Sequence, residues 1–442
     1  MDKDKQKTVA IIGAGLVGSL AANIMANRGY RVELFEKRQD IRKMKVAKGR
    51  SINLALSNRA RVALRIIGLE DEVLKASTPM KGRLIHDVNG NTKSVPYDSI
   101  NGQCLYSISR NFLNKLLIQE MENKSDIKIN FNCKLVDADF TDQKITFLNI
   151  EKSEHFSLNP DFVIAADGAH SVIRRVMQHR CKINYSQTFI DHGYIELTLD
   201  SNHGHLMVPN HLHIWPRGTF MMIALPNLDG SWTVTLFMPF EKFNALKTSD
   251  KLLSFFNTTF PDFLALTTSS QLIKDFFRKQ PLPLISVKCE PYHQKRFLLI
   301  GDAAHAMVPF YGQGMNAGFE DCSILSNLLD RHCDNVDLVF ERFTELRRKD
   351  VFAICDLAMY NYEEMRDLVT KTSYRLRKSV DETLYRCFPG IWIPLYNSVT
   401  FTSMGYNQCM QNRQWQNRVL MASAFSIILS IFLASYIMCN II

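Results

Sequence analysis

The sequence predicts an α/β fold that contains an inserted β-rich region and ends in a membrane-spanning helix. Three observations support this prediction. A glycine-rich turn joins an apolar strand to a helix near the N-terminus, short strands dominate the middle of the chain, and residues 419–442 carry no charge. The 442 residues are 46% hydrophobic and 22% charged, as in folded globular proteins, and suffice for at least two domains.

Charge and cysteine content restrict the classes of partner. The formal net charge is +9, but Lys and Arg are spread along the chain without a long basic block, so we expect no nucleic acid partner. The ten cysteines form no CxxC pair and no Cys/His cluster at zinc spacing, which favours a reduced cytosolic compartment. The charged N-terminus from Met1 to Thr8 leads directly into a strand-like run, so we expect no secretory signal.

The N-terminal elements form a βαβ unit. Residues 7–13 alternate too little for a half-exposed strand and end in glycine, which is typical of a central parallel strand buried on both faces. Residues 16–27 have the pattern of a helix, and residues 31–35 have that of the next parallel strand.

The turn inside this unit carries a GxGxxG pattern at Gly13, Gly15 and Gly18. The first glycine permits a tight turn, the second lets a pyrophosphate approach the backbone, and the third lets helix and strand pack closely. Glu36 follows the second strand, where a carboxylate binds ribose hydroxyls and repels a 2′-phosphate. The unit is therefore predicted to be a Rossmann-type site for FAD or NAD.

Further elements follow in order along the chain. Ser109 is expected to cap a helix that runs to about Asn123. In that helix Asn111 and Asn114 are placed on one side and three leucines on the other, namely Leu113, Leu116 and Leu117. The strand-like runs that come next are residues 128–140, 144–150 and 162–165, with a Thr-Asp-Gln turn between the first two.

The predicted secondary structure changes again towards the C-terminus. Residues 181–285 are β-rich, with strands at 220–225 and 232–238 around a Pro-Asn-Leu-Asp-Gly turn. Residues 297–300 return to a short apolar strand, and helices dominate from Gln313 onward. The predicted domains are a Rossmann-type cofactor-binding part (1–180), a β-rich substrate domain (181–285), a second cofactor-binding part (286–335), a helical region (336–412) and a membrane anchor (413–442).

Two more motifs follow the glycine turn. The segment from Asp167 to Arg174 comes after a buried strand and by itself also fits a plain turn in which Ser171 caps a helix. Gly301-Asp302 follows another buried strand, and residues 309–316 open the next helix. In this order and at these separations, the three segments resemble the single-component FAD-dependent aromatic hydroxylases.

The resemblance implies a bound FAD and a transient NADPH. Asp302 would bind the ribityl chain, and the amides at 314–316 would stabilise negative charge at the flavin. A structural hydrogen bond is the favoured role for His305. The cofactor-binding residues implied are Gly13, Gly15, Leu16, Val17, Gly18, Glu36, Lys37, Arg38, Ala55, Arg110, Leu135, Asp167, Asp302, Gly314, Met315 and Asn316.

Longer strings resemble the kynurenine 3-monooxygenase family in particular. They cover residues 49–57, 211–217, 220–227, 235–240 and 359–362. The resemblance implies NADPH- and O₂-dependent 3-hydroxylation of L-kynurenine to 3-hydroxykynurenine through a flavin C4a-hydroperoxide, as in tryptophan catabolism. Arg83 would bind the substrate carboxylate, and Tyr97, Asn361 and Tyr396 would add hydrogen bonds. Phe237, Pro309 and Phe310 would enclose the ring, while Tyr311 departs from an expected phenylalanine.

His211 and His213 share one face of a strand, but no neighbouring acid or cysteine in the sequence completes a metal site, so we expect none. Two rival functions remain at this stage. One is a related FAD-dependent hydroxylase of another aromatic substrate, and the other is a membrane-anchored flavin-binding interaction protein without turnover.

The tail is the last element. Residues 419–438 carry no charge and follow Arg413 and Arg418. As a helix they would span about 30 Å, the thickness of a bilayer core. The alternative is a buried C-terminal helix. The resemblance implies the mitochondrial outer membrane, with the catalytic body facing the cytosol, and the endoplasmic reticulum remains the alternative destination.

Overall fold

The structure is a computed structural model that describes residues 6–43 and 53–441, with side chains to Ile437. Its first sheet has six strands in the order β18-β19-β12-β1-β2-β8. All neighbouring pairs are parallel except β18 with β19. The strands are β1 (Thr8–Ile12), β2 (Arg31–Phe35), β8 (Ile127–Asn130), β12 (Phe162–Ala165), β18 (His293–Gln294) and β19 (Phe297–Leu299).

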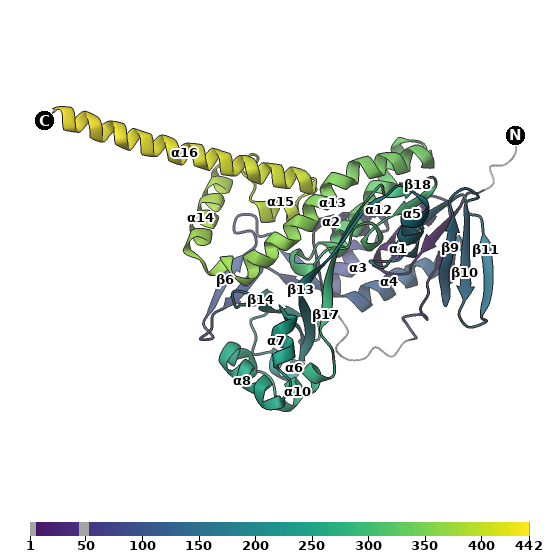
Figure 1. Cartoon of the computed structure of the whole chain (residues 1–442), viewed down its shortest axis with the longest axis horizontal. Coiled ribbons are helices and arrows are strands. Elements are labelled where there is room, and N and C mark those ends of the chain that lie inside the picture. The colour runs from purple at the N-terminus through teal and green to yellow at the C-terminus, as the bar shows by residue number, and fades with distance from the viewer. Residues whose placement is uncertain (1–5, 44–52, 442) are drawn as a thin grey trace.

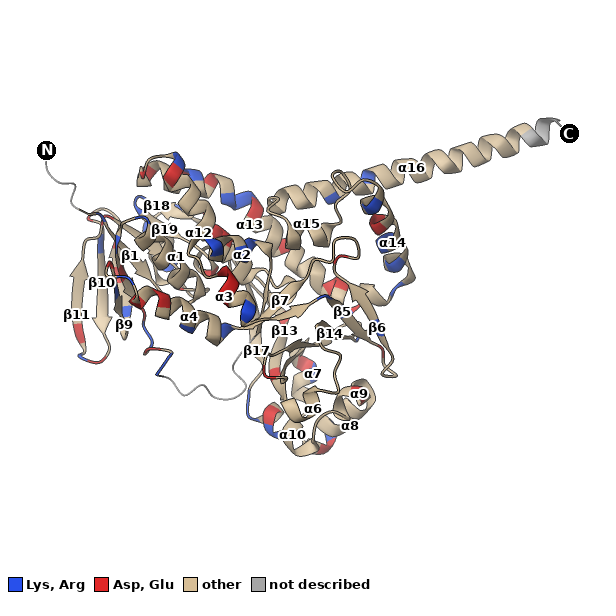
Figure 2. Cartoon of the chain, turned by 180° about the vertical axis from the view of Figure 1, so that it is seen from behind, with Lys and Arg blue, Asp and Glu red and all other residues tan. Residues whose placement is uncertain are grey.

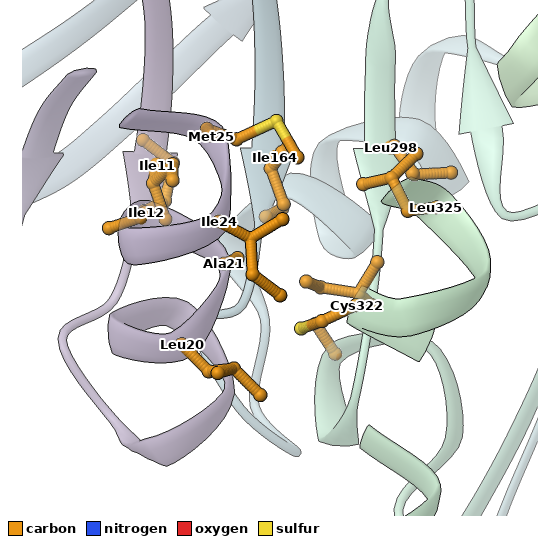
Figure 3. Packing of buried hydrophobic residues seen from close by; sticks show 14 of the residues in the cluster. Ile11, Ile12, Leu20, Ala21, Ile24, Met25, Ile164, Leu298, Cys322 and Leu325 are labelled. Carbon is orange, nitrogen blue, oxygen red and sulfur yellow. The ribbon is translucent and has the colours of Figure 1, made fainter. Parts of the chain in front are cut away.

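The predicted βαβ unit is confirmed, since β1, α1 (Leu16–Asn27) and β2 occupy the expected residues. Figure 3 shows how this sheet is covered: side chains of α1 and α12 (Gly314–Arg331), such as Ile24 and Leu325, lie over Ile164 and Leu298 of the strands. On the sheet's β2 side, Phe35 stacks on Phe147 with ring centroids 4.1 Å apart.

The run predicted as one strand over 128–140 is instead two strands. β8 belongs to the six-stranded sheet, whereas β9 (Cys133–Asp139) pairs with β10 (Lys144–Asn149) in a separate three-stranded sheet that β11 (Glu154–Leu158) completes. Asn132 lies between them with φ +55°, a left-handed conformation that asparagine tolerates better than most residues and that interrupts an extended strand.

The helix α4 (Arg110–Glu122) begins as expected, because the Ser109 hydroxyl accepts a hydrogen bond from the Phe112 amide. One detail of its pattern is wrong. Asn114 lies on the buried face with the leucines, where its side-chain amide donates to the Ala14 carbonyl at 3.1 Å. The contact compensates for burying a polar group and joins α4 to the glycine turn.

A seven-stranded sheet forms the second layer of the molecule, in the order β17-β13-β16-β15-β14-β5-β6. The turn between β15 and β16 lies where it was expected. The segment 181–285 is not purely β-rich, because helices α6 to α10 pack on this sheet at the lower end of the body in Figure 1. The strands are β5 (Gly82–His86), β6 (Thr92–Pro96), β13 (Asn184–Leu199), β14 (His211–Pro216), β15 (Met221–Pro226), β16 (Trp232–Pro239) and β17 (Leu282–Glu290). The helices are α6 (Ser201–Gly204), α7 (Phe240–Ala245), α8 (Ser249–Thr259), α9 (Pro261–Leu264) and α10 (Ser269–Phe277).

A small antiparallel sheet lies between the two large ones, in the order β3-β7-β4. Its strands are β3 (Asn53–Leu56), β7 (Leu105–Ser109) and β4 (Thr78–Met80). The helices α2 (Asn58–Ile66) and α3 (Glu70–Lys75) connect β3 to β4, whereas α5 (Val172–Arg180) packs against β9. Within the string at 49–57 that carried part of the resemblance, residues 49–52 lie outside the described residues. The exact domain boundaries stay a prediction.

Helices dominate the C-terminal third as expected. They are α11 (Asp302–His305), α12, α13 (Val336–Arg366), α14 (Thr372–Cys387), α15 (Leu395–Phe401) and α16 (Tyr406–Ile441), with 3₁₀ turns at Pro309–Tyr311 and Leu368–Thr370. Figure 1 shows α16 leaving the body as one continuous rod. Its part from Tyr406 to Ile437 is long and apolar enough to cross a membrane, and none of its most apolar window is buried. A buried C-terminal helix is therefore contradicted.

Candidate active site

A cavity of about 660 Å³ extends from the glycine turn to the start of α12. Of the predicted cofactor residues, all but Gly18 and Asn316 line it. Gly13 has φ +100°, and a Cβ there would lie 2.6 Å from the Ala166 carbonyl oxygen. A Cβ on Gly15 would meet nothing within 4 Å, so the backbone is open to the cavity at the N-terminus of α1. Such a helix start favours a phosphate group.

Gly18 and Asn316 support this cavity from behind. A Cβ on Gly18 would lie 1.9 Å from the Gly13 carbonyl oxygen. The helix can therefore pack this closely against the turn only if residue 18 is glycine. The buried Asn316 side chain donates to the Ala55 carbonyl at 2.8 Å and accepts from the Ser57 amide at 2.8 Å. It thereby fixes the β3 segment beside the start of α12.

Glu36 closes the far end of the cavity. Its carboxylate accepts hydrogen bonds from the Ala14 amide at 2.9 Å and from the amide and side chain of Arg38 at 2.9 and 2.8 Å. Burial pushes the pKa of Glu36 upward, but the bonds from Arg38 and Ala14 outweigh it and leave the pKa below its ordinary value. The group is therefore an anion at neutral pH.

The loop around Asp302 is braced from below. His305 Nε2 lies 2.6 Å from Asp321 Oδ2, the Gly301 amide donates to the same oxygen at 2.8 Å, and Arg347 Nε donates to Asp321 Oδ1 at 2.9 Å. Burial would raise the pKa of Asp321, but His305 and Arg347 hold it below its usual range. This geometry agrees with the structural role expected for His305, whereas Asp302 is exposed to the cavity.

A second cavity of about 280 Å³ adjoins the first, and Asn53, Ala55, Met307, Pro309 and Gly312 line both. All seven predicted substrate residues line the second one. Most of its wall is apolar. Phe310 stacks on Tyr362 at 3.8 Å between ring centroids and meets Phe237 edge-on at 5.0 Å.

Arg83 provides the positive charge of this cavity. It is buried on β5, its Nη1 donates to Glu364 Oε1 at 2.8 Å, and its guanidinium lies 4.5 Å from the centre of the Tyr396 ring. The contact to Asn361 Oδ1 is longer, at 3.4 Å. The buried Nε of Arg83 finds no hydrogen-bond partner among the described residues. A donor is thus left for a ligand.

The tyrosines around Arg83 are kept neutral. Burial, and then the neighbouring Tyr396, raises the pKa of Tyr97 well above its usual value. Burial likewise raises the pKa of Tyr396 and of Tyr311. Their hydroxyls therefore remain protonated hydrogen-bonding groups at neutral pH.

A polar recess lies on the other side of these residues. Arg83, Tyr97, Tyr311 and Tyr396 form the partition between the recess and the apolar cavity. We call it the vestibule, and its remaining wall comes mainly from α13, α14 and residues 95–99, and includes Glu364, Tyr374, Arg377 and Tyr385.

Comparisons with known proteins assign the family. A protein family described as an FAD binding domain matches residues 6–334. Kynurenine 3-monooxygenase of Anopheles gambiae is 50% identical over 415 residues, which cover 93% of this chain and 85% of that protein. The enzyme of Sus scrofa is 44% identical over 425 residues, or 96% and 90% of the two chains. The chain belongs to the kynurenine 3-monooxygenase family.

Solved structures agree on the fold. 2-Methyl-3-hydroxypyridine-5-carboxylic acid oxygenase superposes with a TM-score of 0.68 at 19% identity, covering 82% of this chain and 93% of that one. PqsL of Pseudomonas aeruginosa gives a TM-score of 0.67 at 18% identity, covering 82% and 97%. The kynurenine 3-monooxygenase family therefore shares its FAD-binding monooxygenase fold with more distant oxygenases.

The residues of this member of the kynurenine 3-monooxygenase family fit an FAD. The buried Oδ1 of Asp167 faces the first cavity without a hydrogen-bond partner among the described residues, while Oδ2 accepts from the Val172 amide at 2.7 Å. Burial raises the pKa of Asp167 despite that bond. A ligand hydroxyl at Oδ1 would satisfy the orphaned oxygen.

Sequence reasoning missed two polar residues of the kynurenine 3-monooxygenase site. Glu364 pairs with Arg83 and accepts a hydrogen bond from the Tyr374 hydroxyl at 2.9 Å. Its sequence context, next to another glutamate, contains no motif that predicts this role. Asn53 donates to Asn227 Oδ1 at 2.6 Å, while its own Oδ1 is buried and unpaired among the described residues at the junction of the two cavities. It was noticed only as part of a family string.

The histidines that suggested a metal have other partners. His213 Nδ1 lies 2.9 Å from His86 Nε2, and His86 Nδ1 lies 2.6 Å from Asp262 Oδ2. His213 Nε2 is 2.8 Å from the Val208 carbonyl, and His211 contacts Ser94. Burial lowers the pKa of His213 to about 3. These contacts form a hydrogen-bonded chain that runs from Asp262 through His86 on β5 to His213 on β14.

Proposed function

We propose that this chain catalyses the NADPH- and O₂-dependent 3-hydroxylation of L-kynurenine to 3-hydroxykynurenine. One observation carries the proposal: an apolar cavity with a buried guanidinium at one end opens directly onto the FAD cavity. The named relatives act on kynurenine, whose aromatic ring and amino-acid group match the two ends of this cavity. FAD, reduced by NADPH, supplies the activation of O₂.

The carboxylate of the substrate is bound at Arg83 in this proposal. Arg83 is a strong anion partner because it is desolvated and keeps an unused donor at Nε. Neutral Tyr97 and Tyr396 add hydroxyl donors, and Asn361 adds an amide. Glu364 pairs with Arg83 from the vestibule side and holds the guanidinium in place for the carboxylate.

The ring of the substrate is held at the apolar end. Phe237, Pro309 and Phe310 exclude water there, and the stack of Phe310 on Tyr362 fixes the orientation of that wall. The aromatic amine of kynurenine donates electrons into its own ring, so the carbon beside it reacts without a protein base. No residue is therefore assigned as catalytic.

The proposed cofactor contacts use fixed groups. The backbone at Gly15 would bind the phosphates, and Glu36 would accept hydrogen bonds from the ribose hydroxyls. Asp302 and Asp167 line the part of the cavity between the phosphate end and the ring end. The start of α12 at Gly314 and Met315 provides amides and a positive helix end beside the second cavity. These amides would stabilise negative charge on the ring system of a bound FAD without titrating.

The proposed location is the mitochondrial outer membrane, with the body in the cytosol and α16 as the anchor. The support is that α16 contains a stretch long and apolar enough to cross a membrane, and none of its most apolar window is buried. The endoplasmic reticulum is the competing destination. Imaging of the tagged full chain against markers of both membranes separates them, and a diffuse cytosolic signal would overturn the anchor.

The decisive test of the activity is product analysis. Purified chain is incubated with L-kynurenine, NADPH and O₂, and 3-hydroxykynurenine is expected in amounts that match NADPH consumed. A panel of other anilines and phenols tests the rival hydroxylase, which would show faster coupled turnover on one of them. A yellow protein that consumes no NADPH with any substrate would instead favour a flavin-binding interaction protein.

A further inference from the structure

The helix α14 has an exposed apolar side near the base of α16. Figures 1 and 2 show α14 on the side of the body from which α16 leaves, with its axis running across that of α16. Leu376 on this helix is 67% exposed, and Phe388 and Ile391 in the turn after it are 54% and 63% exposed. Large apolar side chains that gather in this way mark an interaction surface.

The same side contains an apolar groove. Its walls are Val380 and Leu384 of α14, Phe388, Ile391 and Trp392 of the following turn, and Trp415, Val419 and Leu420 of α16. Val419 is also the first residue of the uncharged tail. The groove therefore opens where the proposed membrane span begins.

The angle between the two helices is fixed by buried polar contacts. Asp381 of α14 accepts from Arg413 of α16 at 2.7 Å and from the Trp392 indole at 3.0 Å. Arg377 donates to Asn417 of α16 at 2.7 Å. Because α14 runs across α16, α14 extends along the surface of a bilayer that α16 crosses.

We propose that α14 and the turn from Phe388 to Ile391 rest on the lipid bilayer surface beside α16. This inference rests on the proposed membrane span. The groove is continuous with that span, and the Trp392–Trp415 pair, with ring centroids 5.6 Å apart, lies at the level where aromatic side chains prefer the membrane interface. Exposed Arg375, Arg386 and Arg418 surround it, which favours anionic headgroups.

The opposite side of α14 gives this contact a consequence for the site. Tyr374, Arg377 and Tyr385 of α14 line the vestibule, and the Tyr374 hydroxyl bonds Glu364. The vestibule is thus held next to the membrane surface, separated from it by one helix.

The test uses two exposed cysteines of the full chain. Cys387 ends α14, and Cys333 lies between α12 and α13, at the other end of α13. Each is labelled alone with a polarity-sensitive fluorophore, after replacing the other and Cys104, Cys181 and Cys439 by Ser. The chain is reconstituted into vesicles of neutral and anionic phospholipid that carry a nitroxide near the headgroup.

The label on Cys387 should lose about half of its fluorescence to the nitroxide, and the label on Cys333 should lose little, because interfacial helices insert only roughly 5–10 Å. The double variant Phe388→Glu/Ile391→Glu should abolish the quenching at Cys387. The matched control Leu346→Glu, which charges an exposed apolar position of α13, should leave it unchanged.

Vesicle flotation separates the two layers of the proposal. Chain that floats with an unquenched Cys387 label overturns the docking of α14 while the span stands. Quenching that survives in the double variant also overturns it. Chain that does not float overturns the span and the docking together.

Discussion

The guanidinium of Arg83 and the carboxylate of Glu364 form an ion pair of 2.8 Å across 281 residues of sequence. Arg83 lies in the partition between the vestibule and the apolar cavity, and Glu364 lies on the vestibule side of it. Both charges are largely removed from water, and each compensates the cost of burying the other.

Replacing Arg83 with Ala should raise the KM for kynurenine by about 30-fold or more, since losing one partner of a buried charge pair costs roughly 2–5 kcal/mol. Flavin absorbance per chain should not change, because Arg83 does not line the first cavity. Steady-state kinetics with absorbance spectra check both values. The Arg83→Ala/Glu364→Gln variant controls for the carboxylate left unpaired, and an unaltered KM in either variant contradicts the assignment.

Replacing Glu364 with Gln should raise KM by about tenfold or more, with kcat nearly constant, because Arg83 loses the charged hydrogen bond that positions it, worth roughly 1.5–3 kcal/mol. The exposed neighbour Glu363→Gln is the matched control and should behave as the unchanged chain does. Equal KM values for both variants would show that Glu364 acts on the fold alone.

Two alanine substitutions in the glycine turn should have opposite signatures. Gly15→Ala meets no protein atom within 4 Å, so the chain should fold but hold little flavin. Gly18→Ala places a Cβ 1.9 Å from the Gly13 carbonyl oxygen and should lower the thermal unfolding midpoint even without FAD. Flavin content and thermal midpoints of both proteins decide this, and a Gly15→Ala chain with full flavin would refute the phosphate contact.

The pKa of His213, lowered to about 3 by burial, predicts a loss of stability in acid. The unfolded chain binds a proton at this residue below about pH 6.5, whereas the folded chain does not until about pH 3. Stability from this group is therefore complete above pH 6.5 and falls between pH 6.5 and 3. At pH 5.5 the loss should be about 1.4 kcal/mol relative to pH 7.5.

The variant His213→Gln should lack this part of the pH dependence. Chemical denaturation of detergent-solubilised chain gives the free energy of unfolding of both proteins at the two pH values. If both proteins lose the same free energy of unfolding between pH 7.5 and pH 5.5, the pKa of His213 is not lowered in the folded chain. The more exposed His211→Gln serves as the comparison.

Local signals predicted local structure well. The glycine spacing located β1, α1 and β2, and the Ser109 cap located the start of α4, because both depend on a few adjacent residues. The split at Asn132 and the burial of Asn114 were missed. Each depends on a tertiary partner, since Asn114 bonds the turn at Ala14 and the two strands join different sheets.

The candidate site shows the same division. Motif residues such as Asp302 could be placed near a cofactor because helix starts and glycine turns have their own pattern. Asn53 and Glu364 could not, since a single Asn or Glu in a chain has no pattern and gains meaning only from Asn227 or Arg83 far away in sequence. For Arg83 itself, the family resemblance supplied what the residue alone did not.

The unbroken helix α13 joins two parts of the molecule that have been treated separately. Near its beginning Arg347 grips Asp321 beneath the Asp302 loop, and near its end Asn361 and Glu364 reach the substrate cavity and Arg83. About 20 Å of rigid helix separates these points. One rigid element therefore sets the distance between the support of the Asp302 loop and the partner of Arg83, so the cofactor end and the substrate end of the site keep a fixed alignment.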